Sequence, residues 1–356
     1  MNLRYTLPRV QGRGAGLGNE LIPWARAFLA AQVLDAHCLE PAFGMNPRRY
    51  WHHFDTPRYD WLSHKAMVHM LPHIQLTQAD YIRCGGGDFV NAFQIFAKEH
   101  KLYQRSCYVL STEGMWGGYR HIAAARDFVY ATLYQSRFAA RNLLALQARL
   151  NRDKVTVAMH VRMGDFGAAP SQLSDYQGKF NLALPLQWYC NVARSIQQQL
   201  GDDVQFLVVS DGTPAQLCPV LDNLDAITTA DIPDSDCSDV LALANADMLV
   251  CSISSFSLTA AFLSKAPYLW FEPNLQRHDN NFYSIWGHEK SQLAEGSGTF
   301  EALKKSALQN TMPKGRGTPI PIDGQVPSAL LKTIVDARQM QCQHTDLLFY
   351  GVVKNA

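Results

Sequence analysis

The sequence predicts an α/β protein with a doubly wound parallel sheet, and the clearest evidence lies in the second half of the chain. Apolar, β-branched runs of strand length alternate there with helical segments; the runs cover 154–161, 205–211, 246–254 and 266–273. The segment 184–200 between two of them has apolar residues three and four apart and ends at Gly201, a helix stop. Strands that alternate with helices form parallel βαβ units with right-handed crossovers.

The first half of the chain shows the same alternation less clearly, and the length of the chain agrees with a second domain. A chain of 356 residues exceeds the size at which one hydrophobic core keeps growing. A Gly-rich loop at 12–18 precedes an amphipathic helix. Strands that run into Gly-rich loops are predicted at 79–89 and 105–116, and one long helix is predicted over 121–150.

The domain boundary is expected where this long helix ends. We therefore expect an N-terminal α/β domain over residues 1–151 and a C-terminal Rossmann-like domain with a tail over 152–356. Within the tail, the Gly/Pro-rich stretch 312–324 is predicted to be a loop, and a final helix is predicted from Pro327.

The composition is that of a globular protein without a general nucleic-acid surface. Hydrophobic residues make up 47% of the chain, and 32 basic residues against 31 acidic ones give a net charge of +1, whereas nucleic-acid surfaces need an excess of cations. No signal peptide or membrane-spanning apolar run is visible. Eight cysteines without a C-x-x-C pair argue against a zinc or redox site. We expect a soluble, cytoplasmic protein, or the catalytic part of a longer one.

The strongest local feature is HVRMGDF at 160–166, where an apolar strand ends. His160, Arg162 and Asp165 occur together where an open α/β sheet presents its ligand-binding loops. An arginine there can hold a diphosphate through two parallel hydrogen bonds and neutralise the charge that develops on a leaving group. The alternative is that Arg162 and Asp165 only pair with each other in a loop.

A second strand, at 206–212, ends in Ser210, Asp211 and a glycine. A hydroxyl and a carboxylate therefore meet at one tight turn. Two interpretations stay open here: Asp211 binds a ribose or a base, or it only shapes the turn before the next helix.

A third strand, in the segment 251–265, ends in a cluster of serines before a helix of small residues begins; they are Ser252, Ser254, Ser255 and Ser257. Free N–H groups at a helix start, with hydroxyls beside them, form an anion site. Serine is also an ordinary cap residue, but four serines exceed what capping needs. The cluster therefore favours a phosphate site.

The Gly-rich loop GRGAGLGNE at 12–20 opens the first predicted helix. It fails the dinucleotide pattern G-x-G-x-x-G, because the last glycine required is Leu17 or Asn19, and it lacks the Gly-Lys-Ser/Thr of a P-loop. A nicotinamide-dependent dehydrogenase and ATP hydrolysis are therefore disfavoured. A mobile backbone that faces a ligand and a simple structural turn both remain as interpretations.

Together the four segments resemble those of the fucosyltransferase superfamily, the α1,2-fucosyltransferases above all, with the α1,6- and protein O-fucosyltransferases as relatives. That group typically carries a GLGNQL-like loop, an HxRRGD motif, a strand ending in FSD and a segment like SNSTFSWWAAWL. The corresponding segments of this chain, in the same order, are GLGNEL at 16–21, HVRMGD at 160–165, VVSDG at 208–212 and SISSFSLTAAFL at 252–263.

The resemblance implies a GT-B-like architecture, in which two Rossmann-like doubly wound domains face a cleft and the second binds most of the donor. It implies that Arg162 grips the donor phosphates and that His160 supports this loop, with Ser210 and Asp211 beside the nucleotide. The diphosphate and base would be lined by Ser254, Ser255 and Phe256. From the first domain, the residues that would reach the reacting sugar and the acceptor are Gly16, Gly18 and Asn19.

The chain departs from the family pattern at three places. The second arginine of HxRRGD is Met163, the tandem tryptophan is Leu258-Thr259, and GNQ has become GNE. These changes weaken the prediction of fucose, and of an α1,2 linkage in particular, more than the prediction of a nucleotide-sugar site.

The sequence thus favours a metal-independent, inverting glycosyltransferase of carbohydrate metabolism. It would transfer fucose from GDP-fucose, or the sugar of a similar nucleotide sugar, to a saccharide or a lipid-linked oligosaccharide. In the family an arginine and a helix N-terminus replace the metal, so no cofactor is expected. Asp165 and Glu20 are the candidate bases. Nucleic acid is not an expected partner, and peripheral contact with a membrane stays open.

Two other functions stay open. An acidic loop with Asp234 and Asp236 fits the Asp-x-Asp signature of metal-dependent glycosyltransferases, although a solvated loop that caps a helix explains it as well. The missing second arginine also leaves room for a non-catalytic nucleotide- or glycan-binding protein of the same fold. On the acceptor side, the aromatic and basic segment 47–61 is either a carbohydrate groove or an ordinary packed loop.

Overall fold

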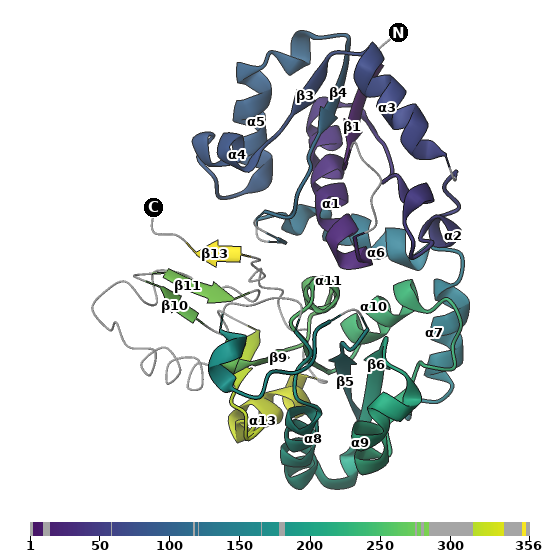
Figure 1. Cartoon of the computed structure of the whole chain (residues 1–356), viewed down its shortest axis with the longest axis vertical. Coiled ribbons are helices and arrows are strands. Elements are labelled where there is room, and N and C mark those ends of the chain that lie inside the picture. Colours follow the sequence, from purple (N-terminus) through teal and green to yellow (C-terminus); the bar gives the residue numbers. More distant parts are fainter. Residues whose placement is uncertain are drawn as a thin grey trace. The chain divides into compact units, whose positions relative to one another are not determined.

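The computed structural model divides into two compact α/β units, Met1–Ala139 and Ala140–Ala356 (Figure 1). The division falls upstream of the boundary expected near residue 151. The structure describes residues 3–9, 15–57, 59–116, 118–119, 121–164, 166–177, 182–274, 276–278, 281–284, 316–337 and 351–353.

The N-terminal unit contains a four-stranded parallel sheet in the order β2-β1-β4-β3. Its strands are β1 (Leu3–Leu7), β2 (His37–Cys38), β3 (His73–Gln75) and β4 (Cys107–Ser111). The helices are α1 (Leu17–Leu34), α2 (Trp51–Phe54), α3 (Asp60–Met70), α4 (Gln78–Arg83), α5 (Phe89–Glu99) and α6 (Arg126–Tyr134), with short 3-10 turns η1 (Phe43–Met45), η2 (Leu102–Gln104) and η3 (Ala123–Ala125).

The C-terminal unit contains a six-stranded sheet in the order β12-β9-β8-β5-β6-β7, and every pair in it is parallel. The strands are β5 (Val155–Val161), β6 (Val204–Ser210), β7 (Ile227–Thr228), β8 (Met248–Val250), β9 (Tyr268–Phe271) and β12 (Gly317–Ile320). Numbered along the chain, this order is 3-2-1-4-5-6 of the Rossmann fold. Its direction reverses between β5 and β8.

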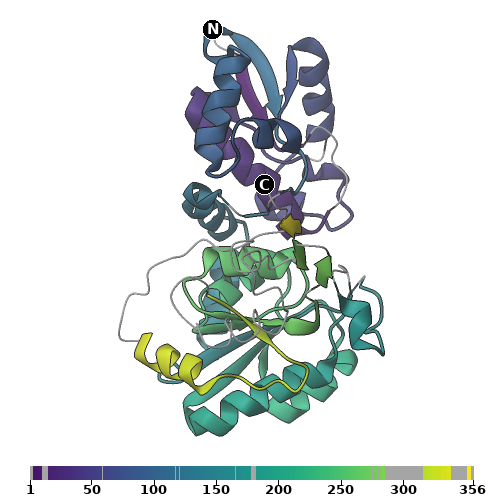
Figure 2. The ribbon, with the colours of Figure 1, turned by 90° about the vertical axis from the view of Figure 1, so that its left-hand side faces the viewer.

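Helices cover both faces of this sheet (Figure 2). α8 packs against α9 and α13, and α10 packs against α11. The bounds are α7 (Ala139–Gln147), α8 (Leu186–Leu200), α9 (Pro214–Leu224), α10 (Asp236–Ala244), α11 (Ser255–Leu263) and α13 (Ser328–Ala337), with 3-10 turns η4 (Leu173–Tyr176), η5 (Gly201–Asp203) and η6 (Glu272–Asn274). A separate antiparallel sheet joins β10 (Gln276–His278), β11 (Asn281–Ser284) and β13 (Gly351–Val353).

The core of the C-terminal unit explains why its strands are continuous apolar runs. Val157, Ala158, Met159 and Val161 of β5 are all fully buried, as expected for a central parallel strand that has helices on both faces. The prediction of doubly wound α/β sheets is therefore confirmed for both units. Among the helices that the structure describes, none has the length and apolar character needed to cross a membrane.

Three local predictions are wrong. The segment 79–89 is not a strand but helix α4 and a loop, because Thr77 and Asp80 form a capping box that starts a helix. The predicted helix over 121–150 is divided into η3, α6 and α7. The predicted loop 312–324 contains strand β12, which pairs with β9 along its whole length.

Candidate functional site

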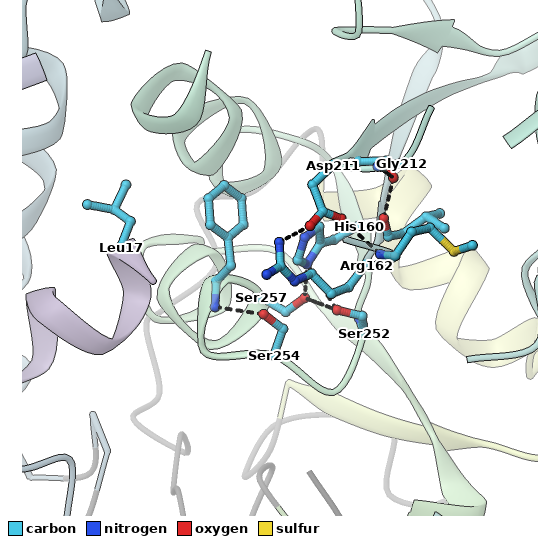
Figure 3. A network of polar contacts seen from close by, with 12 residues as sticks. Leu17, His160, Arg162, Asp211, Gly212, Ser252, Ser254 and Ser257 are labelled. Carbon is cyan, nitrogen blue, oxygen red and sulfur yellow. Dashed lines mark hydrogen bonds and ion pairs between the residues drawn. The ribbon is translucent and has the colours of Figure 1, made fainter. Parts of the chain in front are cut away.

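The candidate site lies at the carboxyl ends of the strands on both sides of the topological switch point in the C-terminal unit. Met159 of β5 is paired with Val250 of β8, and Val161 of β5 is paired with Ser210 of β6. Arg162, Asp211 and the serine cluster therefore emerge at the same edge of the sheet (Figure 3). In open α/β sheets this is the place where ligands bind.

Arg162 forms an ion pair with Asp211, in which Nη1 of the arginine donates to Oδ2 of the aspartate. The other carboxylate oxygen, Oδ1, accepts from the backbone N–H of Met163 at 2.8 Å. The guanidinium also lies over the ring of Phe166, with Cζ 4.9 Å from the ring centroid. Asp211 thus fixes both the arginine and the backbone that follows β5. The predicted alternative partner, Asp165, lies outside the described residues.

Gly164 allows the loop after β5 to approach Asp211 this closely. A Cβ atom at position 164 would lie 1.9 Å from Asp211 Oδ2 and 2.8 Å from Asp211 Cγ, so any other residue there would have to displace the Asp211 carboxylate. The requirement for glycine here was not predicted from the sequence. The only signal for it is the glycine of the HVRMGD segment itself.

The turn after β6 is held by Ser210 and covered by Met163. Ser210 Oγ donates to the carbonyl of Val161 and accepts from the backbone N–H of Gly212 at 3.0 Å. A Cβ at Gly212 would lie 2.9 Å from Met163 Cγ. Ser210 therefore ties β6 to β5, and Met163 packs on the turn between Ser210 and Gly212.

His160 links β5 to the start of helix α11. Its Nδ1 lies 2.6 Å from Ser257 Oγ and 3.1 Å from Ser252 Oγ, and Ser257 Oγ accepts from the backbone N–H of Ser252 at 3.1 Å. All three residues are buried. Burial, with the nearby charge of Arg162 as a smaller cause, lowers the pKa of His160 to about 3. The neutral ring can accept a hydrogen bond donated by the Ser257 hydroxyl. Ser252 and Ser257 therefore have a structural role, which is to join β5 to α11.

The N-terminus of α11 uses Ser254 as its cap and leaves backbone donors at its first turn. Ser254 Oγ accepts from the N–H of Phe256 at 3.2 Å. The first N–H groups of a helix have no partner inside the helix, and those of Ser255 and Ser257 meet no acceptor among the described residues. The ring of Phe256 lies against His160, with 4.9 Å between centroids. The serine cluster thus combines capping with donors suited to an anion.

In the N-terminal unit, the loop before α1 is anchored by side chains from several elements. Glu20 Oε1 accepts from Arg9 Nη1 at 3.1 Å and from the N–H of Ala15 at 3.2 Å. Burial raises the pKa of Glu20, which the charge of Arg9 partly offsets. The N–H of Leu17 donates to Tyr50 Oη at 2.9 Å.

The resemblance assigns Gly16, Gly18 and Asn19 to the reacting sugar and the acceptor, and all three lie at the start of α1. Gly16 is the N-cap of α1, and a Cβ there would meet nothing within 4 Å. Gly18 is buried in the first turn of α1. Asn19 Oδ1 is buried and has no hydrogen-bond partner within the part of the chain that the structure describes. Packing therefore does not require glycine at position 16. The Asn19 side-chain oxygen is an acceptor that a ligand can use.

The acidic loop before α10 is held by contacts that are structural. Arg149 makes two hydrogen bonds to Asp231, and Asn142 donates to the carbonyls of Pro233 and Asp234. Ser235 Oγ donates to Asp239 Oδ2 at 2.8 Å. Among the residues that the structure describes, no group of three or more His, Cys, Asp or Glu side chains is placed to hold a metal ion.

The aromatic segment 47–61 largely packs on itself and on α1. Phe54 stacks on Phe43, and the ring of Trp24 meets Phe54 at 5.5 Å between centroids. Tyr50 is 2% exposed. Trp51 is only partly buried, with the guanidinium of Arg49 5.9 Å from its ring. The segment therefore contains both packed and accessible rings: Tyr50 is buried, Trp51 and Trp61 are partly exposed, and Tyr59 is 66% exposed.

Comparison with known proteins gives structural similarity without a match in sequence. No family model matches the chain, and no curated protein matches it. The fucosyltransferase NodZ from Bradyrhizobium is 15% identical and has a TM-score of 0.44, over 76% of this chain and 95% of NodZ. POFUT1 in complex with GDP-fucose is 13% identical with a TM-score of 0.41, over 76% of this chain and 98% of POFUT1.

Proposed function

We propose that this chain is a glycosyltransferase whose C-terminal unit binds the diphosphate of a nucleotide sugar. The observation that carries the proposal is the meeting of Arg162, Asp211 and the N-terminus of α11 at the β5–β8 switch point. A fixed guanidinium and helix N-terminal N–H groups are two of the means by which proteins hold phosphate without a metal.

The donor proposed is GDP-fucose, because the four sequence segments resemble those of fucosyltransferases. Arg162 binds the diphosphate, and its ion pair with Asp211 sets the plane of the guanidinium before the donor arrives. The hydroxyl-lined start of α11 binds the same diphosphate through backbone N–H groups.

The reaction proposed is an inverting transfer to a saccharide or a lipid-linked oligosaccharide. The acceptor hydroxyl attacks the anomeric carbon on the face opposite to the leaving GDP. Arg162 then neutralises the charge that develops on the leaving phosphate, as preorganised cations do in other transfers. No metal is required for this step in the proposal, because Arg162 and the α11 dipole supply the positive potential.

A base must take the proton of the acceptor hydroxyl, and Asp165 and Glu20 remain the two candidates. Asp165 is the last residue of the HVRMGD motif, three positions after Arg162. Glu20 is buried, and its contacts with the described residues Arg9 and Ala15 both fall on Oε1. The higher pKa that burial gives Glu20 makes its carboxylate a stronger base than an exposed one. The N-terminal unit is accordingly proposed as the acceptor side, and the cytoplasmic location stays a prediction.

The first test is a thermal-shift panel of the whole chain with GDP, UDP, CDP and ADP, each with and without EDTA. Stabilisation by GDP that EDTA does not change is the expected result, and turnover of GDP-fucose with a panel of saccharide acceptors should follow. A shift with UDP that requires metal would transfer the proposal to the Asp234 loop. No shift with any nucleotide would overturn it.

Arg162→Ala tests the catalytic part of the proposal. Loss of one preorganised charge contact costs about 2.7–4 kcal/mol, so turnover should fall roughly a hundred- to a thousandfold. The matched control is Arg149→Ala, which removes an exposed arginine paired with Asp231 in the same unit and should leave turnover unchanged. Full turnover of the Arg162 variant would show that the leaving phosphate is stabilised elsewhere.

One observation favours a second candidate, a non-catalytic nucleotide-binding protein. Met163 stands where the family has its second arginine, and its side chain packs on Gly212 rather than donating hydrogen bonds. Tight GDP binding without turnover of any sugar nucleotide would select this alternative.

A further inference from the structure

Trp116 lies on a short turn that follows strand β4 in the N-terminal unit. The N–H of Gly118 donates to the carbonyl of Met115 at 3.0 Å, which closes the turn with Trp116 at its second position. Gly114 and Gly118 have φ angles of 89° and 52°, a left-handed backbone that favours glycine. The Trp116 side chain is partly exposed. The turn thus keeps part of a large aromatic ring in contact with solvent.

Arg26 of α1 fixes this turn from inside the unit. Its Nη2 donates to the carbonyls of Gly114 and Trp116 at 3.1 and 3.0 Å, and its Cζ lies 3.8 Å from the centroid of the Trp116 ring. The Nε1 of the same ring donates to the carbonyl of Glu113 at 3.1 Å. Trp116 is therefore held in one orientation through its ring face, its Nε1 and its carbonyl.

The burial of Arg26 opposes folding. The residue is 1% exposed, and its contacts with the described residues are two carbonyl oxygens and an aromatic ring rather than a carboxylate. Burial lowers the pKa of Arg26 to about 9, so the guanidinium stays charged at neutral pH. A buried cation without a counter-charge costs free energy. Features kept at such a cost are found at functional sites, and this one holds a partly exposed tryptophan.

A run of three glycines, Gly85–Gly87, lies beside the turn and connects α4 to α5. Their φ angles are 98°, 58° and 69°, and Gly85 and Gly87 are exposed. Tyr81 of α4 joins the two segments, because its hydroxyl donates to the carbonyl of Gly87 and its ring centroid lies 5.1 Å from that of Trp116. We define the Trp116 surface as Trp116, Tyr81 and Gly85–Gly87. It combines two partly exposed rings with a backbone that carries no side chains.

The Trp116 surface is built on segments that follow the carboxyl ends of two neighbouring strands. Gln75 at the end of β3 pairs with Ser111 at the end of β4. Helix α4 begins at Gln78, three positions after β3, and the Trp116 turn follows β4. The carboxyl ends of parallel strands form the edge at which open α/β sheets bind ligands. The position of the surface therefore supports a role in binding.

We infer that the Trp116 surface binds a sugar ring of the saccharide acceptor, and only the acceptor role of that saccharide rests on the proposed function. The C–H groups on one face of a pyranose are apolar and pack on an aromatic ring, while its hydroxyls need hydrogen-bond partners. The exposed backbone of Gly85 and Gly87 offers such partners, and even a Cβ at either position would meet nothing within 4 Å. Arg26 is a positioning residue, because it holds Trp116 and does not itself touch the sugar.

Binding of the whole chain to an array of immobilised neutral and acidic oligosaccharides, with GDP present, tests the inference without requiring turnover. The unchanged chain should bind a subset of them, and Trp116→Ala should weaken this binding at least about fivefold, because the ring contact is lost. Trp116→Leu keeps apolar bulk over Arg26 without a flat ring and should weaken it as much. Trp116→Tyr keeps a ring and should retain most of the binding. Arg26→Lys loses the planar fork that stacks and donates together, and should weaken binding as well.

Tyr103→Ala is the matched control. Tyr103 is 41% exposed and lies in η2, at the edge of the sheet where β4 begins, so its variant should bind the array as the unchanged chain does. With an acceptor that is turned over, Trp116→Ala should raise the KM for the saccharide at least about fivefold. The kcat and the KM for GDP-fucose should stay within about twofold, because only binding of the acceptor is lost. A merely structural role of Trp116 would not produce this split.

Three results would overturn the inference. They are the absence of oligosaccharide binding by the unchanged chain, equal binding by Trp116→Ala, and a loss of binding in Trp51→Ala that Trp116→Ala does not share, which would place the sugar on segment 47–61. Far-UV circular dichroism reports whether each variant is folded, and the GDP thermal shift reports on the nucleotide site. A chain that binds GDP but no saccharide fails this inference alone, and one that binds saccharide but no nucleotide fails the proposed function alone.

Discussion

At the scale of single residues, the candidate site depends on the close approach of two loops at Gly164. Asp211 contacts both the Arg162 guanidinium and the N–H of Met163, and its carboxylate fills the space where a Cβ of residue 164 would be. Arg162 is only 14% exposed, and its partner Asp211 is 32% exposed. The pair is therefore partly shielded from water, and the interaction is stronger than that of a fully exposed ion pair.

Gly164→Ala should disrupt this pair without removing either charge. The new methyl group would displace the Asp211 carboxylate, because 1.9 Å is far inside van der Waals contact. Steric strain of this kind costs about 1–3 kcal/mol, so GDP affinity measured by calorimetry should fall about tenfold or more. Gly167→Ala in the same loop is the control, since its Cβ would meet only Leu182 Cδ2 at 3.9 Å. An unchanged or higher affinity in the Gly164 variant would mean that Asp211 competes with the phosphate.

At the scale of elements, helix α11 owes its position to contacts at its first turn. Ser257 and Ser252 join it to His160 of β5, and Ser254 caps it. The helix is nine residues long, too short to be stable alone in water. These contacts and the burial of its sides therefore decide where its free N–H groups point.

Ser254→Ala should destabilise the chain by about 1 kcal/mol, the usual cost of removing a cap, and should weaken GDP binding as the first turn frays. Ser255→Ala is the matched control for stability, because the Ser255 side chain makes no hydrogen bond among the described residues while its backbone stays in place. Chemical denaturation of both variants measures the effect on stability, and nucleotide titration of the Ser254 variant measures the effect on binding. Equal losses of stability in the two variants would show that capping is not what orders this turn.

The sequence was most informative where elements follow local rules. Apolar runs located β5, β6, β8 and β9, and the polar residues at their ends located Arg162 and Asp211. The partners of these residues depend on strand order, which no local pattern states: Asp211 comes beside Arg162 because β6 pairs with β5. The serines likewise predicted an anion site, but the hydrogen bonds that commit Ser252 and Ser257 to His160 arise from tertiary packing.

At the scale of the whole molecule, two buried ionisable groups, His160 and Asp239, make the free energy of unfolding depend on pH in opposite directions. Burial lowers the pKa of His160 to about 3. The unfolded chain therefore binds a proton below about pH 6.5 that the folded chain does not, and stability is lost as pH falls. Burial raises the pKa of Asp239 to about 7. The folded chain then keeps a proton that the unfolded chain releases above about pH 4, so stability falls as pH rises towards 7.

Asp239→Asn should separate these two contributions. Asp239 is buried, and burial is the largest cause of its raised pKa, so the variant removes the free-energy cost of ionising a carboxyl group in the core. Relative to the unchanged chain it should gain up to about 4 kcal/mol between pH 4 and pH 8. Urea unfolding of both chains across this range measures the difference in the free energy of unfolding. An effect of the amide that does not depend on pH cancels when the differences at two pH values are compared. Asp234→Asn, at an exposed left-handed position that asparagine tolerates, is the control for replacing a carboxylate by an amide outside the core. A pH-independent difference for Asp239→Asn would show that its carboxyl ionises as readily in the folded chain as in the unfolded one.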